Sequence, residues 1–206
     1  MMTFNEEKHL YTWNGEPIPS VSQVIKSVCG SSYDSIPADV LAKASYRGTA
    51  VHTASELVDG GVCATEYIQS VKSHSETVFG EQIDITLPVE AYARLDRPKW
   101  DLVEHRFYCA GEFPFAGTID RVKDGVPYEI KCNATAKKDS YALQLSFYAK
   151  ALGSDKIGDV YHVTKEGKGN IISGLAPRFA DVDAILRVFY MVHHKQWLKE
   201  AKEKMK

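Results

Sequence analysis

Two acidic side chains and one amine fall at related positions of a predicted β-hairpin. The segment 117–133 reads GTIDRVKDGVPYEIKCN, and its Asp-Gly dipeptide at 124–125 is a strong signal for a two-residue turn. Counting back from that turn places Asp120 directly across from Glu129, where the Cβ atoms of facing residues lie about 4.5–5.5 Å apart. Lys131 comes two residues after Glu129 and therefore projects from the same face of its strand. The spacing predicts a small cluster of Asp120, Glu129 and Lys131.

A divalent cation is the partner that this cluster favours. Like charges directly across an antiparallel ladder destabilise the pair, so a positive group is needed between Asp120 and Glu129. Lys131 supplies part of that charge, and carboxylate oxygens also suit Mg²⁺ or Mn²⁺. A slip of one residue in the turn would place Asp120 on the opposite face. The alternative interpretation is a solvated group of surface salt bridges on an edge hairpin.

A histidine upstream shares a helix face with another carboxylate. In the stretch RGTAVHTASE, helical spacing places His52 and Glu56 on one face, with Gly48 one turn before His52. A glycine inside a helix costs about 1 kcal/mol relative to alanine, so we expect another element or a ligand to approach closely at Gly48. A histidine that only packs against its neighbours is the alternative interpretation of His52.

Three more polar side chains bear on the same region. Gln144 and Tyr148 share a face of the predicted helix that follows the hairpin, and the amide of Gln144 needs a hydrogen-bond partner if it is buried. The same stripe would also serve as a plain core face. Glu104 lies on the predicted strand before the hairpin. A loop with an even number of residues around 109–112 would turn it away from Asp120, and an odd number would put it alongside. The sequence leaves this choice open.

Apolar periodicity and turn signals predict the elements that carry these residues. Helices are expected after Ser20 as an N-cap, from near Pro37 to before 59–61, around 64–79, over 139–152 with Asp139 or Ser140 as the cap, and from Asp181 onward. Strands are expected at 102–108, 114–122, 126–132, 157–165 and 169–176, with a further hairpin turn at Asn14-Gly15. The last helix should bury one face, formed by Val182, Ile185, Leu186, Phe189 and Val192.

This order of elements predicts the α/β class, with a small central mixed β-sheet flanked by helices. The length of 206 residues fits a single domain over 1–206. We expect an N-terminal helical part over about 15–100, a sheet core over about 101–175 and a C-terminal helix over 181–206.

The composition is that of an ordinary globular protein. Hydrophobic residues make up 44% and charged residues 25% of the chain, which argues against disorder.

No apolar run approaches the roughly 20 residues that cross a bilayer, and the N-terminus is too polar for a secretory signal, so we expect no membrane partner and a cytoplasmic location. The net charge of −2 means that any attraction for phosphate must come from local patches. No CxxC pair occurs among the four cysteines, which argues against a zinc knuckle or a disulfide framework: Cys29, Cys63, Cys109 and Cys132.

Taken together, the motifs resemble those of a known enzyme superfamily. RGTAVH, GTID followed by EIK, and QLSFY look like the successive motifs of the PD-(D/E)XK nuclease superfamily, and are most similar to its RecB-like branch. That branch includes phage exonucleases and relatives of the mitochondrial genome-maintenance exonuclease, whose PSVT opening resembles PIPSVSQVI here. The resemblance runs from about Gly15 to Leu152. Two departures are Ile119 in place of the proline of the PD motif and Cys132 where several relatives have Ser or Thr.

The resemblance implies a restriction-endonuclease-like core and a role for each matching residue. The metal ligands would be the side chains of His52, Asp120 and Glu129, the main-chain carbonyl of Ile130 and, for a second ion, Glu104. Lys131 would orient or help deprotonate the attacking water, and Gln144 with Tyr148 would hold the scissile phosphate or the water. The implied cofactor is Mg²⁺ or Mn²⁺, as one or two ions. An iron–sulfur cluster of the family's type is not expected because no cysteine follows Cys132.

The implied activity is that of a metal-dependent exonuclease. It would hydrolyse phosphodiester bonds from the ends of DNA, most readily single-stranded, in phage or mobile-element recombination, repair or replication. A single-strand annealing or replication protein is the implied partner, and the host-cell cytoplasm the implied location. Residues that would follow the backbone or stack on bases are Lys43, Tyr46, Arg47, Lys137 and Lys138. The alternatives are a structure-specific, resolvase-like endonuclease and a catalytically silent nucleic-acid-binding or assembly protein of the same fold.

Overall fold

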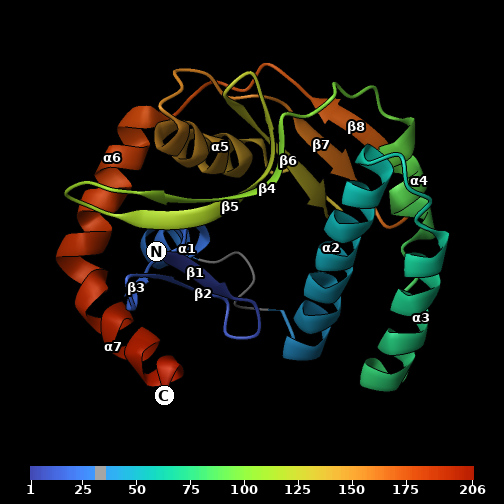
Figure 1. Ribbon diagram of the computed structural model, residues 1–206, viewed down its shortest axis with the longest axis horizontal. Coiled ribbons are helices and arrows are strands. Elements are labelled where there is room, and N and C mark those ends of the chain that lie inside the picture. Colours follow the sequence, from blue (N-terminus) through green and yellow to red (C-terminus); the bar gives the residue numbers. More distant parts are fainter. Residues whose placement is uncertain (31–35) are drawn as a thin grey trace.

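Two β-sheets with helices around them make up the structure, a computed structural model that describes residues 1–30 and 36–206 (Figure 1). The larger sheet has five strands in the order β4-β5-β6-β7-β8, and a separate three-stranded sheet, β1-β2-β3, lies near the N-terminus. In the larger sheet only β6 and β7 are parallel, and helix α5 connects them; the other neighbours are antiparallel. Helices flank this mixed sheet, which confirms the predicted α/β class.

All of the predicted strands are present. The larger sheet consists of β4 (Leu102–Cys109), β5 (Phe115–Lys123), β6 (Val126–Cys132), β7 (Val160–Val163) and β8 (Gly169–Ile172). The smaller sheet consists of β1 (Met2–Asn5), β2 (Leu10–Trp13) and β3 (Glu16–Ile18). Both predicted two-residue turns form, because the residues at 14–15 and at 124–125 all have positive φ, as a type I′ turn requires. Lys123 pairs with Val126, as the count from the turn predicts.

The hairpin of β5 and β6 separates one pair earlier than the count implied. The ladder continues as far as Arg121 opposite Tyr128, so Asp120 and Glu129 are not ladder partners as predicted. From Glu129 onward, β6 pairs with β7 instead. Where the ladder stops, a side-chain hydrogen bond replaces the backbone pairing: the Oδ2 of Asp120 accepts a hydrogen bond of 2.7 Å from the Ile130 amide. The two acidic residues therefore stand where the strands begin to part.

One group of helices packs beside β6 and β7. These helices are α2 (Ala38–Asp59), α3 (Thr65–Phe79) and α4 (Thr86–Arg94). They share a hydrophobic cluster with Ile130, Tyr161 and Val163 of the sheet. Helices α2 and α3 have nearly the predicted bounds, whereas α4 was not predicted. Its sequence contains Pro88, but this proline falls in the first turn, where a missing N–H breaks no hydrogen bond of the helix.

A second hydrophobic cluster joins the sheet to another set of helices. They are α1 (Val21–Cys29), α5 (Lys138–Leu152) and α6 (Phe179–Val188). Ser20 caps α1 as predicted and forms a reciprocal capping box with Gln23. The predicted caps of α5 are wrong: its N-cap is Lys137, whose side chain does not cap the helix, and Asp139 and Ser140 lie inside the first turn.

The predicted single C-terminal helix is interrupted by a π-helical segment. Helix α6 is followed by η1 (Phe189–His193) and then by α7 (His194–Met205). Val182, Leu186 and Phe189 are buried as predicted, but Val192 is 66% exposed. A π-turn spans more residues than an α-turn, so it rotates the positions that follow it away from the previous buried face. This shift explains the error at Val192.

Candidate metal centre

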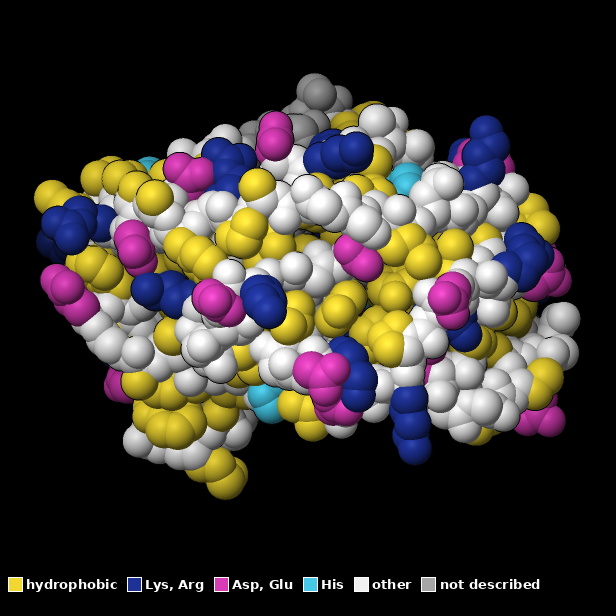
Figure 2. Space-filling model, turned by 90° about the horizontal axis from the view of Figure 1, so that it is seen from above, with side chains coloured by type: hydrophobic (Ala, Val, Ile, Leu, Met, Phe, Trp, Pro, Cys, Tyr) yellow, Lys and Arg dark blue, Asp and Glu magenta, His cyan; other side chains and the backbone are white. Residues whose placement is uncertain are grey.

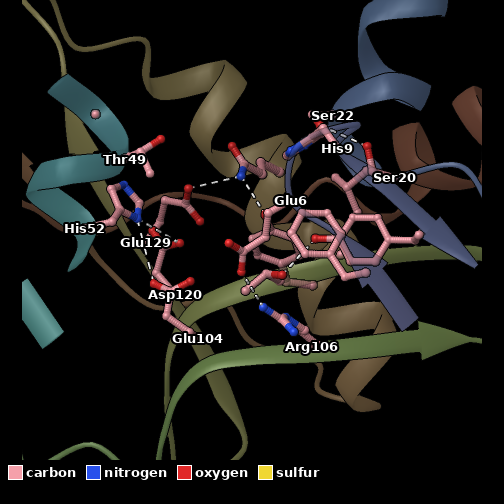
Figure 3. A pocket seen from close by; sticks show the side chains of 18 of the residues that line it. Glu6, His9, Ser20, Ser22, Thr49, His52, Glu104, Arg106, Asp120 and Glu129 are labelled. Carbon is pink, nitrogen blue, oxygen red and sulfur yellow. Dashed lines mark hydrogen bonds and ion pairs between the residues drawn. The ribbon is translucent and has the colours of Figure 1, made fainter. Parts of the chain in front are cut away.

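A cleft of about 600 Å³ lies between α2 and the N-terminal sheet, with residues of β5 along its floor (Figure 3). Acidic side chains and a histidine gather at one end, where Figure 3 labels His52, Glu104, Asp120 and Glu129. Aromatic rings gather at the other end, near Arg106. A volume of this size is typical of small-molecule sites.

Three elements bring one histidine and two carboxylates together. His52 comes from α2, Glu104 from β4 and Asp120 from β5. His52 Nδ1 lies 3.4 Å from Asp120 Oδ1 and 3.9 Å from Glu104 Oε1. One possible ligand atom from each of the three lies within 4.8 Å of the others. Nitrogen and carboxylate oxygen donors at this spacing fit Mn²⁺ or Mg²⁺, as predicted for His52 and Asp120.

The structure settles the position of Glu104, which the sequence left open. Cys109 pairs with Phe115, so the loop between β4 and β5 contains five residues, an odd number. The register on either side of Glu104 then places it opposite Asp120. Glu104 has a φ of +47°, which is uncommon for a residue other than glycine. Such backbone conformations cost about 1–3 kcal/mol and cluster at functional sites, which agrees with a ligand role for this carboxylate.

Glu129 is buried beside this group, and only one of its two oxygens has a hydrogen-bond partner. Its Oε1 accepts from the Lys131 ammonium and, at 3.0 Å, from the Gln144 amide. Its Oε2 is buried and has no partner among the residues that the structure describes. A buried polar atom without a partner calls for an explanation, such as a bound ion or water. This oxygen therefore fits the cation that the neighbouring ligands suggest.

The charges of His52 and Asp120 stabilise each other. Burial alone would lower the pKa of His52, but the adjacent carboxylates, above all Asp120, outweigh it and raise that pKa to about 10. Burial would likewise raise the pKa of Asp120, but the positive charge of His52, followed by that of Lys131, lowers it. A metal ion that binds the ring nitrogen of His52 must displace this proton.

Glu129 behaves in the opposite way. Burial and then the negative charge of Asp120 raise the pKa of Glu129 to about 7, although Lys131 and His52 offset part of the effect. Burial would lower the pKa of Lys131, but the charges of Glu129 and Asp120 outweigh it and raise that pKa. Near neutral pH, Lys131 is therefore an ammonium, and Glu129 changes its charge in the range where a general acid or base works best.

The sequence analysis missed a buried arginine that supports this site. Arg121 is fully buried, and its guanidinium donates to Asp59 at 2.7 Å, to Ser55 at 2.7 Å and to Glu104 at 3.3 Å. Ser55 and Asp59 belong to α2, the helix that carries His52, so these contacts fix α2 against the sheet. The sequence offers little signal for this role, because Arg121 stands between Asp120 and Val122 near the end of its strand and its partners on α2 are distant in sequence.

Gln144 and Tyr148 lie side by side on one face of α5. Both line the cleft, and Gln144 Nε2 donates to the Tyr148 hydroxyl at 2.7 Å as well as to Glu129. The amide of Gln144 thus has the partners that its position on a helix with buried neighbours requires. Ile130 is buried and reaches Asp120 through its amide, while a ligand role for its carbonyl stays a prediction.

The residues predicted to follow a nucleic-acid backbone lie outside this cleft. Lys43 forms an ion pair of 3.0 Å with Glu81, and Tyr46 donates to the carbonyl of Val71 on α3. Lys137 lines an adjoining groove, together with Lys131. The residues of this set that are absent from the lining of the cleft are Lys43, Tyr46, Arg47, Lys137 and Lys138.

Comparisons with known proteins do not identify this chain. A scan against protein-family models found no match, and a search of curated proteins found none either. Within the described part of the chain, no helix has both the length and the apolar character needed to cross a membrane.

Proposed function

We propose that this protein is a metal-dependent nuclease of the PD-(D/E)XK kind that hydrolyses phosphodiester bonds in DNA. The observation that carries the proposal is the meeting of His52, Glu104 and Asp120 at one end of a cleft, beside Glu129 and Lys131. These side chains come from separate elements, and their motifs are the ones that resemble the RecB-like branch of that superfamily.

The ligand set accounts for the metal requirement. His52, Glu104 and Asp120 would hold Mg²⁺ or Mn²⁺, and the Oε2 of Glu129, which has no partner within residues 1–30 and 36–206, is the next available oxygen. When bound, such an ion supplies Lewis-acid chemistry, because it polarises a phosphoryl oxygen and lowers the pKa of a water molecule.

The remaining side chains orient the water and supply positive charge. Lys131, which donates to Glu129, would orient the attacking water, as the resemblance implies. The Lys131 ammonium stabilises negative charge as it develops on the phosphoryl group. Gln144 donates to the same oxygen of Glu129 as Lys131 does, and so holds that carboxylate in one orientation.

A DNA end, most readily single-stranded, is the substrate that the cleft supports best. Its volume of about 600 Å³ suits a small part of a strand rather than a long duplex. The net charge of −2 also offers no broad cationic surface of the kind that grips duplex DNA. A phage or mobile-element role, an annealing or replication protein as partner and a host-cell cytoplasmic location stay predictions from the resemblance.

A cleavage assay with matched variants tests the proposal. End-labelled linear and circular DNA, single- and double-stranded, is incubated with Mg²⁺, Mn²⁺ or EDTA. Asp120→Asn and Lys131→Ala should each reduce metal-dependent cleavage by at least about 100-fold. Asp101→Asn and Lys123→Ala are the controls, because these residues form an exposed pair of 3.0 Å near the tip of the same hairpin. Neither control should change the rate by more than about twofold.

Each outcome has a distinct meaning. Cleavage of linear but not circular DNA supports an exonuclease, and cleavage of both supports the endonuclease alternative. Metal-independent cleavage, or full activity in Asp120→Asn, would overturn the mechanism. If the intact protein cleaves no substrate with either ion, the nuclease proposal is wrong, and the catalytically silent binding protein takes its place.

A further inference from the structure

The end of the cleft opposite the acidic group is lined by aromatic side chains from the N-terminal sheet. Phe4 on β1 and Tyr11 on β2 are stacked with ring centroids 4.3 Å apart, and His9 meets Phe4 edge-on at 5.4 Å. We propose that this aromatic end (Phe4, His9 and Tyr11) is a subsite for a nucleobase of the nucleotide next to the scissile phosphate. The inference rests on the proposed function and names the part of the substrate that this end holds.

The charges at the aromatic end favour a base over a phosphate. Arg106 lies over the ring of Phe4, with its guanidinium carbon 5.1 Å from the ring centroid, but it is already paired with Glu6 at 3.2 Å. A phosphate there would be repelled by the carboxylate of Glu6. Arg106 would attract that phosphate less strongly, because it already pairs with Glu6. A base carries no charge, and its flat faces stack on aromatic rings and on guanidinium planes. The Arg106 side chain is half exposed, so it is free to cover the outer face of such a base.

Three lysine side chains lie on the other side of the cleft wall. Lys26, Lys131 and Lys137 line the adjoining groove, and Ser22 and Gln144 line both the groove and the cleft. The two hollows therefore differ in chemistry: one presents ammonium groups and the other presents rings. This division suits a strand whose flanking phosphates follow the groove while the scissile phosphate and one base enter the cleft.

The aromatic end is held in place before any ligand binds. Phe4 and Tyr11 are directly opposite each other in the ladder of β1 and β2. Tyr11 is only 3% exposed, and its hydroxyl forms a hydrogen bond of 2.7 Å with Thr118 of β5. Because the partly exposed ring of Phe4 is held against the buried Tyr11, stacking a base on Phe4 costs little additional ordering of the protein.

The spacing along β5 matches one nucleotide. Thr118, which holds Tyr11, is two residues before Asp120, a separation of about 7 Å along a strand. A phosphate at the acidic group would thus have its own sugar and base within reach of the aromatic end. Both ends are visible in Figure 3, with His52 and Asp120 on one side and Arg106 on the other.

Kinetics with matched variants and damaged substrates test the subsite. Phe4→Ala removes the ring, and Phe4→Leu removes it while keeping apolar packing. Trp13→Ala is the control, because Trp13 of the same sheet also stacks on a tyrosine, Tyr108, at 4.3 Å but does not line the cleft. Each protein is assayed with Mn²⁺ on single-stranded oligonucleotides that are intact or carry one abasic site at successive terminal positions. Thermal melting of each variant confirms that it is folded.

We expect both Phe4 variants to raise KM by roughly 5- to 100-fold, the effect of losing one base–aromatic stack. One abasic position should raise KM for the unaltered protein by a similar factor and should add nothing further in Phe4→Ala. Trp13→Ala should change neither value. Unchanged KM in a folded Phe4→Leu, or equal abasic effects in the unaltered protein and Phe4→Ala, would overturn the subsite while leaving the nuclease proposal intact.

The failure of the proposed function gives a different result. If the unaltered protein cleaves nothing, the same proteins and oligonucleotides are compared by fluorescence anisotropy in EDTA. Tighter binding of the unaltered protein than of Phe4→Leu, lost with the abasic oligonucleotide, would support the base subsite in a binding protein. No binding of any oligonucleotide would overturn both proposals.

Discussion

Asp120 and Glu129 are both buried, but the oxygens of the two carboxylates have different hydrogen-bond partners. On one side, both oxygens of Asp120 have partners, His52 and the amide of Ile130. On the other side, one oxygen of Glu129 accepts from Lys131 and a second donor, and the other has no described partner. Their pKa values move apart accordingly: that of Asp120 is lowered, and that of Glu129 is raised to about 7. Burial acts to raise both pKa values, and the partners of each carboxylate decide whether that effect is outweighed.

The comparison assigns different tasks to the two sides. On the Asp120 side, which we call the completed side, each carboxylate has a charged partner within the protein: His52 for Asp120 and the buried Arg121 for Glu104. The Glu129 side is incomplete, and it carries the group that exchanges protons near neutral pH. We therefore expect changes on the first side to act on folding as well as on metal binding, and changes on the second to act mainly on chemistry.

The largest effect on stability is expected at Arg121, which supports the completed side. Arg121→Leu leaves Asp59 and Glu104 without their shared buried cation, so the free energy of unfolding should fall by about 3–5 kcal/mol. Arg94→Leu is the control, because Arg94 is exposed, and it should change stability by no more than about 0.5 kcal/mol. Urea denaturation measures both. Equal small losses in the two variants would mean that Arg121 does not hold α2 against the sheet.

The next largest effect is a difference in sign between the two carboxylates. In EDTA at about pH 8, Asp120→Asn removes the charge that stabilises His52, so the free energy of unfolding should fall by about 1–3 kcal/mol. Glu129→Gln removes a carboxylate that is costly to bury in its charged form, so stability should rise by up to about 1 kcal/mol at the same pH. Both variants should lose activity. Losses of stability that are equal in the two variants would contradict the comparison.

Much of this arrangement could be predicted from the sequence. The turn at 124–125 fixed the register near the tip, and helical spacing placed His52 and Gln144 on the correct elements. The position of Glu104 could not be derived, because it depends on a loop of five residues whose length only the paired strands reveal. Arg121 escaped because strand alternation gives no sign that a charge is buried when its partners lie on a distant helix.

The separation of β5 and β6 was the other surprise. A count from the turn assumes that two strands stay paired, but Glu129 pairs with β7 instead of β5. That choice is made by the parallel neighbour, which reaches the sheet only after α5 and so lies beyond any local pattern. The prediction of neighbouring carboxylates remained useful because both side chains still line the same cleft.

A third prediction uses pH to separate proton binding from metal binding. Folding raises the pKa of Glu129 from 4.5 to about 7 and that of His52 from 6.5 to about 10, so the folded protein holds more protons than the unfolded chain across these intervals. Their contribution to stability is complete below the unfolded pKa values and is lost as the pH rises through the folded ones. In EDTA, the melting temperature should therefore fall as the pH rises from about 6 to about 8.5.

Added Mn²⁺ should counteract this fall. Metal ligands must give up their protons, so the increase in melting temperature that Mn²⁺ produces should be larger near pH 8.5 than near pH 6, by about 2–4 °C for each kcal/mol of added stability. His52→Gln should reduce the fall of the melting temperature with rising pH that is measured in EDTA, because a glutamine side chain does not titrate. A shift of the same size at both pH values would show that Mn²⁺ does not compete with these protons.

The smallest effect on stability is expected at Gly48, and it tests whether substrate reaches α2 beside the completed side. A Cβ at Gly48 would meet no described atom within 4 Å. No described element of the protein therefore approaches this glycine closely, which was one of the two reasons that the sequence allowed for it. A ligand is the other reason. Gly48 also lines the cleft. Gly48→Ala should raise the free energy of unfolding by up to about 1 kcal/mol, as alanine is the better helix former, and should nevertheless raise KM for DNA.

Gly117→Ala provides the contrast, because a Cβ at that position would lie 2.9 Å from the ring of Phe107. This variant should lose stability, since the buried ring must shift to make room. Alanine at Gly48 thus separates folding from function, whereas alanine at Gly117 does not. If Gly48→Ala gains stability and keeps its KM, the strand of DNA does not pass along this turn of α2, and the substrate must enter the cleft from the side of Glu129 alone.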